Sequence, residues 1–187
     1  MGRPKAGLSL GRDGETLIAR VVKTLTRAGL APVVVVAGAH VDAVRSALAP
    51  ADRLAQVVVN TDWQRGQLSS LLAGLDAIDT PTLEAAMVTL VDVPMVSAST
   101  VETLVHEWRR TRAPIVRPAQ GDRHGHPVIF DRAVFADLRE ADLNVGAKAV
   151  FVKHRLHVLD VPVDDPGAFE DIDTPEDYER LAAAIRR

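Results

Sequence analysis

The sequence of 187 residues contains no cysteine, which excludes disulfide bonds, thiolate metal sites and a thiol nucleophile. Long hydrophobic runs are also missing. No stretch approaches the roughly 18 apolar residues of a membrane span, and the N-terminus has no apolar signal core. The formal net charge is only -3, so nothing electrostatic favours nucleic acid as a partner. These absences favour a cytoplasmic protein that binds neither membranes nor nucleic acids.

Three catalytic sequence motifs are absent as well. The chain has no Gly-x-Ser-x-Gly nucleophile turn, no Gly-x-Gly-x-x-Gly dinucleotide fingerprint and no Walker loop. Its composition, with 47% hydrophobic and 25% charged residues, is that of an ordinary globular protein. A chain of this length fits one domain with a proper core, so we expect residues 1–187 to form a single domain.

The pattern of apolar residues predicts strands that alternate with helices. The β-branched runs 33–37 and 56–59 are typical of strands buried on both faces, and 86–91 resembles them. Segments whose apolar residues recur at helical spacing lie between these runs. The expected helices are 15–29, 40–49, 68–78, 98–111, 131–140, 145–153 and 175–185, and further short strands are expected at 113–116, 127–130 and 156–161. This alternation predicts a three-layer α/β fold with a mainly parallel sheet.

Two acidic segments far apart in the sequence suggest a metal site. Asp92 follows the apolar run at 86–91, and Asp173 lies just before the last expected helix. Open α/β sheets bind ligands at the carboxyl ends of their strands, where Asp92 should stand. Mg²⁺ binds one or two carboxylates plus substrate phosphates, so this pair predicts phosphoryl or nucleotidyl chemistry. Alternatively, Asp92 is a turn residue and Asp173 belongs to a helix start capped by Thr174.

A polar loop and a basic N-terminus are further candidates. Arg3 and Lys5, with Gly2, make the chain's opening basic, although such a segment alone is usually a solvated tail. Segment 60–70 lies between a strand end and a helix start, where backbone N–H groups meet an anion or a base edge. An ordinary β–α loop with serine caps explains it about equally well. Its candidate binding residues are Asn60, Trp63, Gly66, Ser69 and Ser70.

Two histidines, His124 and His126, should share one face of an extended segment. They would make half a metal site, but no third soft ligand is near, so a polar loop on the substrate side is favoured. Among apolar residues, Leu75, Ile78 and Trp108 would support a dimer face. Core packing explains these three equally well.

In this order, the segments resemble the MobA-like nucleotidyltransferase family, especially its molybdenum-cofactor cytidylyltransferase branch. Met-Gly-Arg-Pro-Lys-Ala at 1–6 resembles the end of the family's glycine-rich loop. Segment 60–70 resembles its base-contacting loop, and Val-Asp-Val-Pro at 91–94 its Gly-Asp-Gln-Pro metal motif. The family's Arg-Gly-His-Pro segment and C-terminal acidic run have counterparts at 124–130 and 171–178, and residues 146–148 also match.

The resemblance implies a Rossmann-like nucleotidyltransferase domain that moves a nucleoside monophosphate, CMP from CTP being favoured, to a phosphorylated acceptor such as molybdopterin, with release of pyrophosphate. It implies that Asp92 and Asp173 hold Mg²⁺ and that Lys5, with Gly2 and Arg3, contacts the phosphates. The loop at 60–70 would hold the base. The acceptor would face His124, Gly125 and His126.

The chain departs from the family at three places. It begins where the family's glycine-rich loop ends, so the first strand is missing, and a sheet without this central strand would have open edges. We expect the strand and loop to be encoded upstream in frame, and a stop codon immediately upstream would contradict this. Val93 replaces a polar residue of the metal motif, and His124 stands where an Arg is common.

Two other functions remain open at this point. Some MobA-like chains carry the name nicotine blue oxidoreductase, so the resemblance also allows an NAD(P)H-dependent oxidoreductase. Alternatively, loss of the glycine-rich loop leaves a non-catalytic remnant with an accessory role. Mg²⁺-dependent use of a nucleoside triphosphate, consumption of NADPH, or the absence of any nucleotide effect on the melting temperature would separate the three.

Overall fold

The computed structural model describes residues 5–10 and 14–185, so the expected nucleotide-binding residues Gly2 and Arg3 lie outside it. The helices are α1 (Leu17–Arg27), α2 (Val41–Leu48), α3 (Gln67–Ile78), α4 (Ala98–Thr111), α5 (Phe135–Glu140), α6 (Lys148–Lys153) and α7 (Pro175–Ile185). The strands are β1 (Ser9–Leu10), β2 (Glu15–Thr16), β3 (Val34–Ala37), β4 (Gln56–Val59), β5 (Ala85–Val88), β6 (Ile115–Gln120), β7 (Arg123–His124), β8 (Val128–Asp131) and β9 (Val158–Pro162). None of the helices in these ranges is long and apolar enough to cross a membrane.

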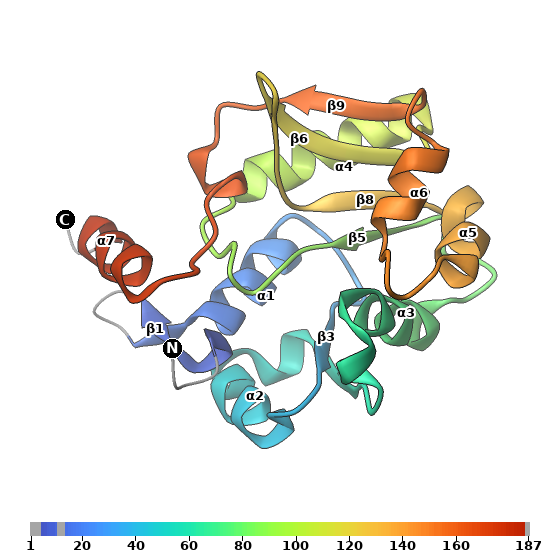
Figure 1. Ribbon diagram of the computed structural model, residues 1–187. Helices are drawn as coiled ribbons and strands as arrows, with labels where there is room; N and C mark the ends of the chain where they lie inside the picture. The colour runs from blue at the N-terminus through green and yellow to red at the C-terminus, as the bar shows by residue number, and fades with distance from the viewer. Residues whose placement is uncertain (1–4, 11–13, 186–187) are drawn as a thin grey trace.

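The longer strands form two groups (Figure 1). β3 and β4 pair in parallel, and β5, β8, β6 and β9 lie side by side in that order. β8 is antiparallel to both β5 and β6, whereas β9 is parallel to β6. β5, β6 and β9 therefore run in the same direction, and β8 is the reversed strand. The expected α/β fold with a mainly parallel sheet is confirmed.

Helices cover both faces of the strands, which gives three layers. Adjacent residues of β6 show the alternation, because Val116 packs against Trp108 of α4 while Ile115 packs with Leu138 of α5. On the first face lie α1, α2 and α4, and on the second α3, α5 and α6. Trp108 is buried, as is Leu75 of α3, and Ile78 packs against the same core. Core packing therefore accounts for these three residues, which the sequence also allowed as a dimer face.

Helix ends follow the signals in the sequence. The Thr16 hydroxyl accepts a hydrogen bond from the Ala19 N–H at 3.2 Å at the start of α1. At the start of α7, Thr174 and Asp177 cap each other, since each backbone N–H donates to the other's side-chain oxygen, at 3.0 and 3.1 Å. The expected N-cap role of Thr174 is thereby confirmed, and the exchange is the capping-box arrangement with Asp in place of Glu.

The third strand ends earlier than its apolar run suggests. The sequence predicts a strand over 86–91, whereas β5 ends at Val88. Beyond it, the Val93 N–H donates to the Leu90 carbonyl in a turn, and the Asp92 carbonyl accepts from the Ile172 N–H at 2.9 Å. β5 pairs with β8 only as far as Val88, which lies opposite Val128, and beyond it the Asp92 carbonyl bonds to the C-terminal segment instead. This pairing brings the two acidic segments together.

Asp165 fastens the segment ahead of Ile172 to the start of α4. Its Oδ2 accepts hydrogen bonds from the Ser97 N–H at 2.9 Å and the Thr100 hydroxyl at 2.6 Å, and its Oδ1 accepts from the Gly167 N–H at 3.1 Å. Desolvation alone would raise the pKa of Asp165, but these hydrogen bonds outweigh it and hold the pKa below the ordinary 3.8.

We expect Asp165→Asn to lower the free energy of unfolding by about 1–3 kcal/mol at pH 7, because donors aimed at a carboxylate lose their acceptor. A carboxyl whose pKa is lower in the folded state stabilises above its unfolded pKa. That stability is lost as the pH falls from there through the folded pKa. Denaturant unfolding at a series of pH values should therefore show the two proteins converging below about pH 4. A difference that is constant with pH would contradict an ionised Asp165.

Candidate functional site

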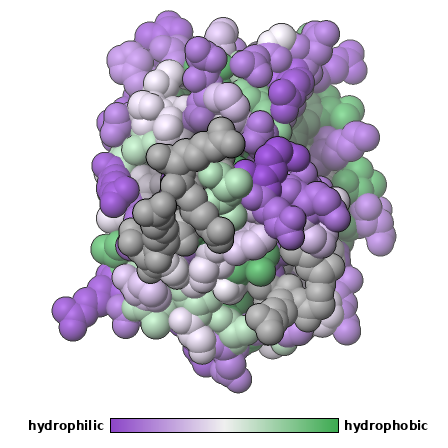
Figure 2. Space-filling view, turned by 90° about the vertical axis from the view of Figure 1, so that its left-hand side faces the viewer, coloured by the Kyte–Doolittle hydropathy of each residue, from purple (hydrophilic) through white to green (hydrophobic). Residues whose placement is uncertain are grey.

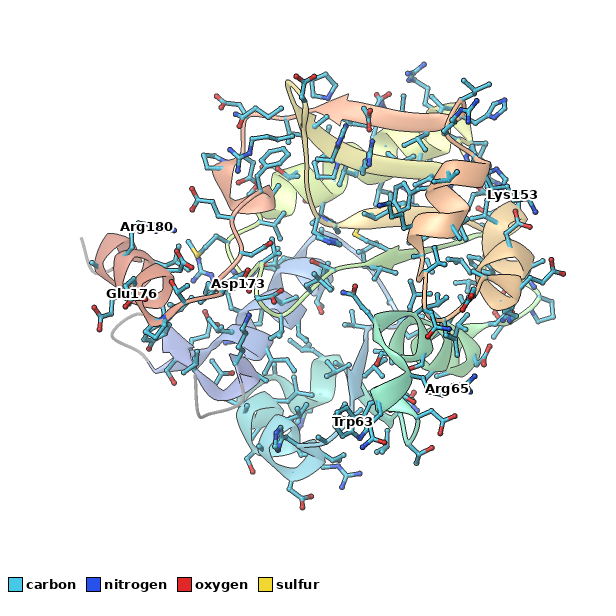
Figure 3. The ribbon with its side chains drawn as sticks, in the orientation of Figure 1. Trp63, Arg65, Lys153, Asp173, Glu176 and Arg180 are labelled. Atoms are coloured by element: carbon cyan, nitrogen blue, oxygen red, sulfur yellow. The ribbon has the colours of Figure 1, made fainter. Side chains whose placement is uncertain are left out.

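Three side chains that the sequence singled out meet at the carboxyl end of β5. The Lys5 ammonium lies 2.8 Å from Asp173 Oδ1 and 3.3 Å from Asp92 Oδ2. Lys5 comes from a short 3₁₀ helix at the start of the described chain, Asp92 from the turn after β5, and Asp173 from the segment before α7. Figure 3 labels Asp173 on that segment. The contact between Asp92 and Ile172 fixes this meeting, since it ties the two segments by their backbones.

The charges of this cluster favour a cation. Desolvation works against the ammonium of Lys5, but its hydrogen bond to Asp173 and the charge of Asp92 prevail, and the pKa of Lys5 is raised. A third carboxyl, Asp171, has its pKa raised by desolvation and by the charges of Asp92 and Asp173. The charges of Asp92 and Asp173 therefore repel a charge on Asp171, and a bound cation would relieve this repulsion. One ammonium group leaves an excess of negative charge for such a cation to offset.

The oxygen donors of the cluster fit a hard divalent metal ion. Asp92 Oδ1 is buried and has no hydrogen-bond partner in the described chain, although Oδ2 of the same carboxylate contacts Lys5. Residues 5–10 and 14–185 contain no group of three or more His, Cys, Asp and Glu side chains that could hold a metal. Two carboxylates suffice for Mg²⁺, which keeps waters and takes substrate phosphates as its other ligands. The pair Asp92 and Asp173 meets that requirement.

His126 stands beside this cluster with an unused ring nitrogen. Desolvation lowers its pKa, and a hydrogen bond to the backbone of Val88 together with the charges of Asp171 and Asp92 only partly opposes this. The lowered pKa favours the neutral ring, and its buried Nδ1 has no partner in the described part of the chain. A neutral imidazole nitrogen of this kind is a ready hydrogen-bond acceptor.

The backbone explains how His126 is held. Its N–H donates to the Ala168 carbonyl at 2.9 Å. At Gly125, an added Cβ would lie 2.0 Å from the same carbonyl oxygen, so only glycine permits this approach. His124 points elsewhere, with its Nε2 3.3 Å from Asp160 Oδ2. The two histidines thus contact different groups.

The loop at 60–70 is braced by its own polar side chains. Asn60 is buried, its amide donates to the Ser69 and Ser70 hydroxyls at 2.9 and 3.0 Å, and its oxygen accepts from the Asp62 N–H. Asn60 and Ser69 therefore brace the loop, and the contact with the nucleotide that the sequence predicts for them stays a prediction. Gly66, with φ of +98°, starts α3 in a conformation that side chains rarely adopt.

Trp63 is the exposed aromatic residue of that loop. The residue is 43% exposed, and its Cβ packs so closely on Gly38 that a Cβ added at residue 38 would come within 2.7 Å of it. Figure 3 shows Trp63 on the segment before α3. Figure 2 looks onto the side of the molecule at which β5 and β9 end, and hydrophilic and apolar residues both reach that surface. A braced loop with an exposed aromatic ring is suited to stacking against a base.

Sequence reasoning missed two polar groups here. Thr89 Oγ1 is buried without a partner in the described residues, close to the end of β5. Arg117 lies on β6 with its Nε 2.6 Å from Asp160 Oδ1. Thr89 belongs to a run that the sequence assigns to a buried strand, so nothing marked its hydroxyl as available. Arg117 is one of many scattered arginines, and only the pairing of β6 with β9 brings it to Asp160.

An α/β sheet with paired carboxylates and a lysine beyond its strand ends defines an enzyme class that transfers phosphoryl or nucleotidyl groups. The comparison with known families makes this specific. Residues 1–158 match the model of the MobA-like NTP transferase domain, and the chain belongs to this family of nucleotidyltransferases.

Individual relatives carry two kinds of name. The chain is 32% identical to nicotine blue oxidoreductase of Paenarthrobacter nicotinovorans, over 94% of this chain and 91% of that protein. It is 26% identical to molybdenum cofactor guanylyltransferase of Shewanella sediminis, over 69% of this chain and 67% of that one.

Among solved structures, Rv0371c of Mycobacterium tuberculosis superimposes with a TM-score of 0.80 at 28% identity, covering 98% of this chain and 90% of that one. A structure of the same protein in complex with manganese matches with a TM-score of 0.75 at 30% identity, covering 97% and 93%. A relative in this family thus binds a divalent metal ion.

Proposed function

We propose that this protein transfers a nucleoside monophosphate from a nucleoside triphosphate to a phosphorylated acceptor of the molybdopterin type and releases pyrophosphate. The cluster of Lys5, Asp92 and Asp173 carries the proposal, because it combines a phosphate-binding cation with two metal-binding carboxylates at the end of β5. CTP is the favoured donor, on the resemblance to the cytidylyltransferase branch. The guanylyltransferase name of the Shewanella relative makes GTP its direct competitor.

Each residue of the site would have its own role in binding or positioning the substrates. Asp92 and Asp173 would hold Mg²⁺, which when bound offsets the charge that develops on the phosphates. Lys5 would leave the carboxylates and contact the phosphates of the nucleotide. Trp63 would stack on the base, at a loop kept in place by Asn60. The Nδ1 of His126, which has no partner among the described residues, would accept a hydrogen bond from the phosphorylated substrate that receives the nucleotide. Positioning and electrostatics, with no protein acid or base, would supply the rate enhancement.

Pyrophosphate release tests this proposal. The protein is incubated with Mg²⁺, a molybdopterin-type acceptor and CTP, GTP or ATP in turn. We expect one of these nucleotides to yield pyrophosphate together with a nucleotide-linked acceptor, and chelation of Mg²⁺ to stop the reaction. Pyrophosphate from none of the three, with a folded protein, would contradict the proposal.

A second candidate function rests on one observation. The 32% identity to nicotine blue oxidoreductase extends over 94% of the chain, so NAD(P)H-dependent reduction of a quinone-like pigment is the alternative. Oxidation of NADPH followed by absorbance in the presence of such a pigment tests it. Turnover there that does not require Mg²⁺ and persists in Asp92→Asn would favour the oxidoreductase.

We expect Lys5→Met to change metal binding and nucleotide binding in opposite directions. In the free protein Lys5 occupies the carboxylates, so its removal should tighten the binding of Mn²⁺ alone severalfold. The same change removes a charged phosphate contact and should weaken binding of the nucleotide by at least about tenfold. Calorimetric titrations with Mn²⁺ and with Mg²⁺–nucleotide measure both, and Lys153→Met, on exposed α6, is the matched control. Weaker Mn²⁺ binding in Lys5→Met would contradict this.

A further inference from the structure

Arg117 of β6 is bound to the neighbouring strand through its Nε nitrogen alone. It lies opposite Asp160 of β9 in the parallel register, and its Nε–H donates to Asp160 Oδ1 at 2.6 Å. Within the described part of the chain, Nη1 and Nη2 of Arg117 make no hydrogen bond. A guanidinium group carries N–H donors on all three nitrogens. The outer edge of Arg117 therefore keeps donors that a further acceptor can use.

The contacts of the Arg117 side chain hold that edge in one position. The guanidinium carbon lies 5.3 Å from the ring centroid of Phe151 in α6, and the side chain is only 22% exposed. Desolvation alone would raise the pKa of Asp160, but the hydrogen bond and charge of Arg117, together with His124, outweigh it and lower that pKa below the ordinary 3.8. An ionised Asp160 thus anchors Arg117 from one side, and Phe151 supports its plane.

Arg112 shows how a purely structural ion pair differs. Its Nη1 and Nη2 donate to the two carboxylate oxygens of Glu84 at 3.2 and 3.0 Å, and its guanidinium carbon lies 4.7 Å from the ring centroid of Trp108. Both arginines pair with a carboxylate and cover an aromatic ring. Only Arg112 of these two uses its Nη donors for the carboxylate. An ion pair between strands explains the contact of Arg117 with Asp160, but not the unused donors.

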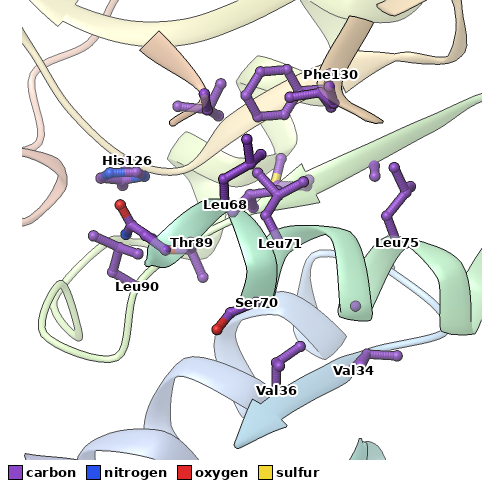
Figure 4. A pocket seen from close by; sticks show the side chains of 18 of the residues that line it. Val34, Val36, Leu68, Ser70, Leu71, Leu75, Thr89, Leu90, His126 and Phe130 are labelled. Carbon is purple, nitrogen blue, oxygen red and sulfur yellow. The ribbon is translucent and has the colours of Figure 1, made fainter. Parts of the chain in front are cut away.

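The chain places Arg117 near the metal-binding cluster. The Gly125 N–H donates to the Pro118 carbonyl at 3.1 Å, next to Arg117 on β6. The residue after Gly125 is His126, whose pKa responds to the charge of Asp92. Arg117 and His126 line the same cavity. Figure 4 shows His126 in it, above Thr89 and Leu90, which follow β5.

The charged residues of this cavity favour an anion. The Lys and Arg residues that line it within the described chain are Arg117, Lys148 and Arg155, and the only Asp or Glu is Asp160. Lys148 and Arg155 are exposed, so they attract an anion from solvent. This local excess of positive charge contrasts with the net charge of -3 of the whole chain. Charge of one sign in a cleft raises the local concentration of ligands of the opposite sign.

We propose that Arg117 binds the phosphate group of the acceptor through Nη1 and Nη2, and that Asp160 is the positioning residue that orients it. Phosphate oxygens accept the two parallel N–H groups of a guanidinium edge, a geometry that lysine cannot offer. That the anion belongs to the acceptor rests on the proposed function, in which Lys5 contacts the phosphates of the nucleotide.

Phenyl phosphate, a phosphomonoester without a nucleotide, tests the site without turnover. The full chain is titrated in the absence of divalent metal, and NMR follows the Nε–Hε signal of Arg117 and the backbone amides. We expect saturable shifts at Arg117, and Arg117→Gln should weaken binding at least about tenfold. Arg117→Lys keeps the charge but loses the paired donors, so its affinity should fall between the two. Arg112→Gln is the matched control and should bind phenyl phosphate as the unaltered protein does.

Asp160→Asn separates positioning from simple charge attraction. The change removes the negative charge beside Arg117, so attraction by charge alone predicts tighter binding of phenyl phosphate. A guanidinium group that is no longer held predicts weaker binding. We expect the affinity to fall severalfold while the Tm shows a folded protein. Equal or tighter binding in Asp160→Asn would contradict its positioning role.

Two crossed titrations identify the substrate that supplies the phosphate. Lys5→Met should bind phenyl phosphate as tightly as the unaltered protein, and Arg117→Gln should bind Mg²⁺–nucleotide normally. Loss of nucleotide binding in Arg117→Gln would assign Arg117 to the nucleotide and overturn the proposal. So would phenyl phosphate binding that Arg117→Gln and Arg117→Lys leave unchanged. Because these readouts are binding constants, failure here is distinguishable from an absence of pyrophosphate release.

Discussion

Asp92→Asn should reduce Mg²⁺-dependent nucleotidyl transfer at least about 100-fold, the usual effect of removing one electrostatic contact made in the transition state. The change keeps the volume of the side chain but removes its negative charge. In Asp92 this charge is shared by Oδ2, which contacts Lys5, and by the buried Oδ1. The backbone carbonyl of Asp92, which pairs with Ile172, is untouched. Pyrophosphate release at saturating nucleotide measures the effect, and an unchanged Tm shows that the fold persists.

Two further variants, one inside the site and one outside it, are compared with Asp92→Asn. Asp173→Asn should also lower transfer strongly, because its carboxylate is the other proposed metal ligand. Asp42→Asn changes a fully exposed carboxylate on α2 and should leave the rate unchanged. A rate for Asp92→Asn within threefold of the unaltered protein would rule out Asp92 as a metal ligand.

Gly125→Ala should be the most destabilising single methyl group in the site. Its Cβ would lie 2.0 Å from the Ala168 carbonyl oxygen and 2.8 Å from the carbonyl carbon. These are backbone atoms of a turn in which the Ala168 N–H donates to the Asp165 carbonyl at 3.0 Å, so they cannot rotate away as a side chain would. Overpacking of this kind costs about 2 kcal/mol or more, which corresponds to a fall in Tm of about 4–8 °C. Thermal unfolding followed by circular dichroism measures it.

Gly7→Ala is the control for this change. Gly7 has no atom within 4 Å of an added Cβ, so its replacement should alter the free energy of unfolding by less than about 1 kcal/mol. Because the clash also moves the backbone of His126, Gly125→Ala should raise the KM for the acceptor in the protein that remains folded. Equal Tm values for the two alanine variants would show that residues 125 and 168 are farther apart than the structure places them.

Much of the fold could be predicted from periodicity and caps. The helix expected at 98–111 is α4, Ala98–Thr111, because its apolar spacing, its Ser97 cap and its length all agree. The cap of α7 was predictable for the same reason, since Thr174 and Pro175 are strong local signals. Local sequence determines such features without help from the rest of the chain.

Other features depend on contacts between distant residues. β5 ends at Val88, opposite the first residue of β8, and Asp92 beyond it bonds to Ile172; no local pattern records either pairing. The sequence predicts Asn60 as a nucleotide ligand, and the structure adds that its amide donates to Ser69 and Ser70. Composition alone cannot tell a polar group that binds substrate from one that braces a loop. The meeting of Lys5, Asp92 and Asp173 was anticipated through family resemblance, while their roles stay a proposal.

Calorimetric titration shows most directly whether the protein binds a nucleoside triphosphate with Mg²⁺ through Asp92. The protein is titrated in a calorimeter with CTP, GTP, ATP and NADPH, each with and without Mg²⁺, and the titrations are repeated with Asp92→Asn. We expect saturable binding of one nucleoside triphosphate that requires Mg²⁺ and is lost in the variant. Binding of NADPH alone, unaffected by Mg²⁺ and by the loss of the Asp92 charge, would contradict it.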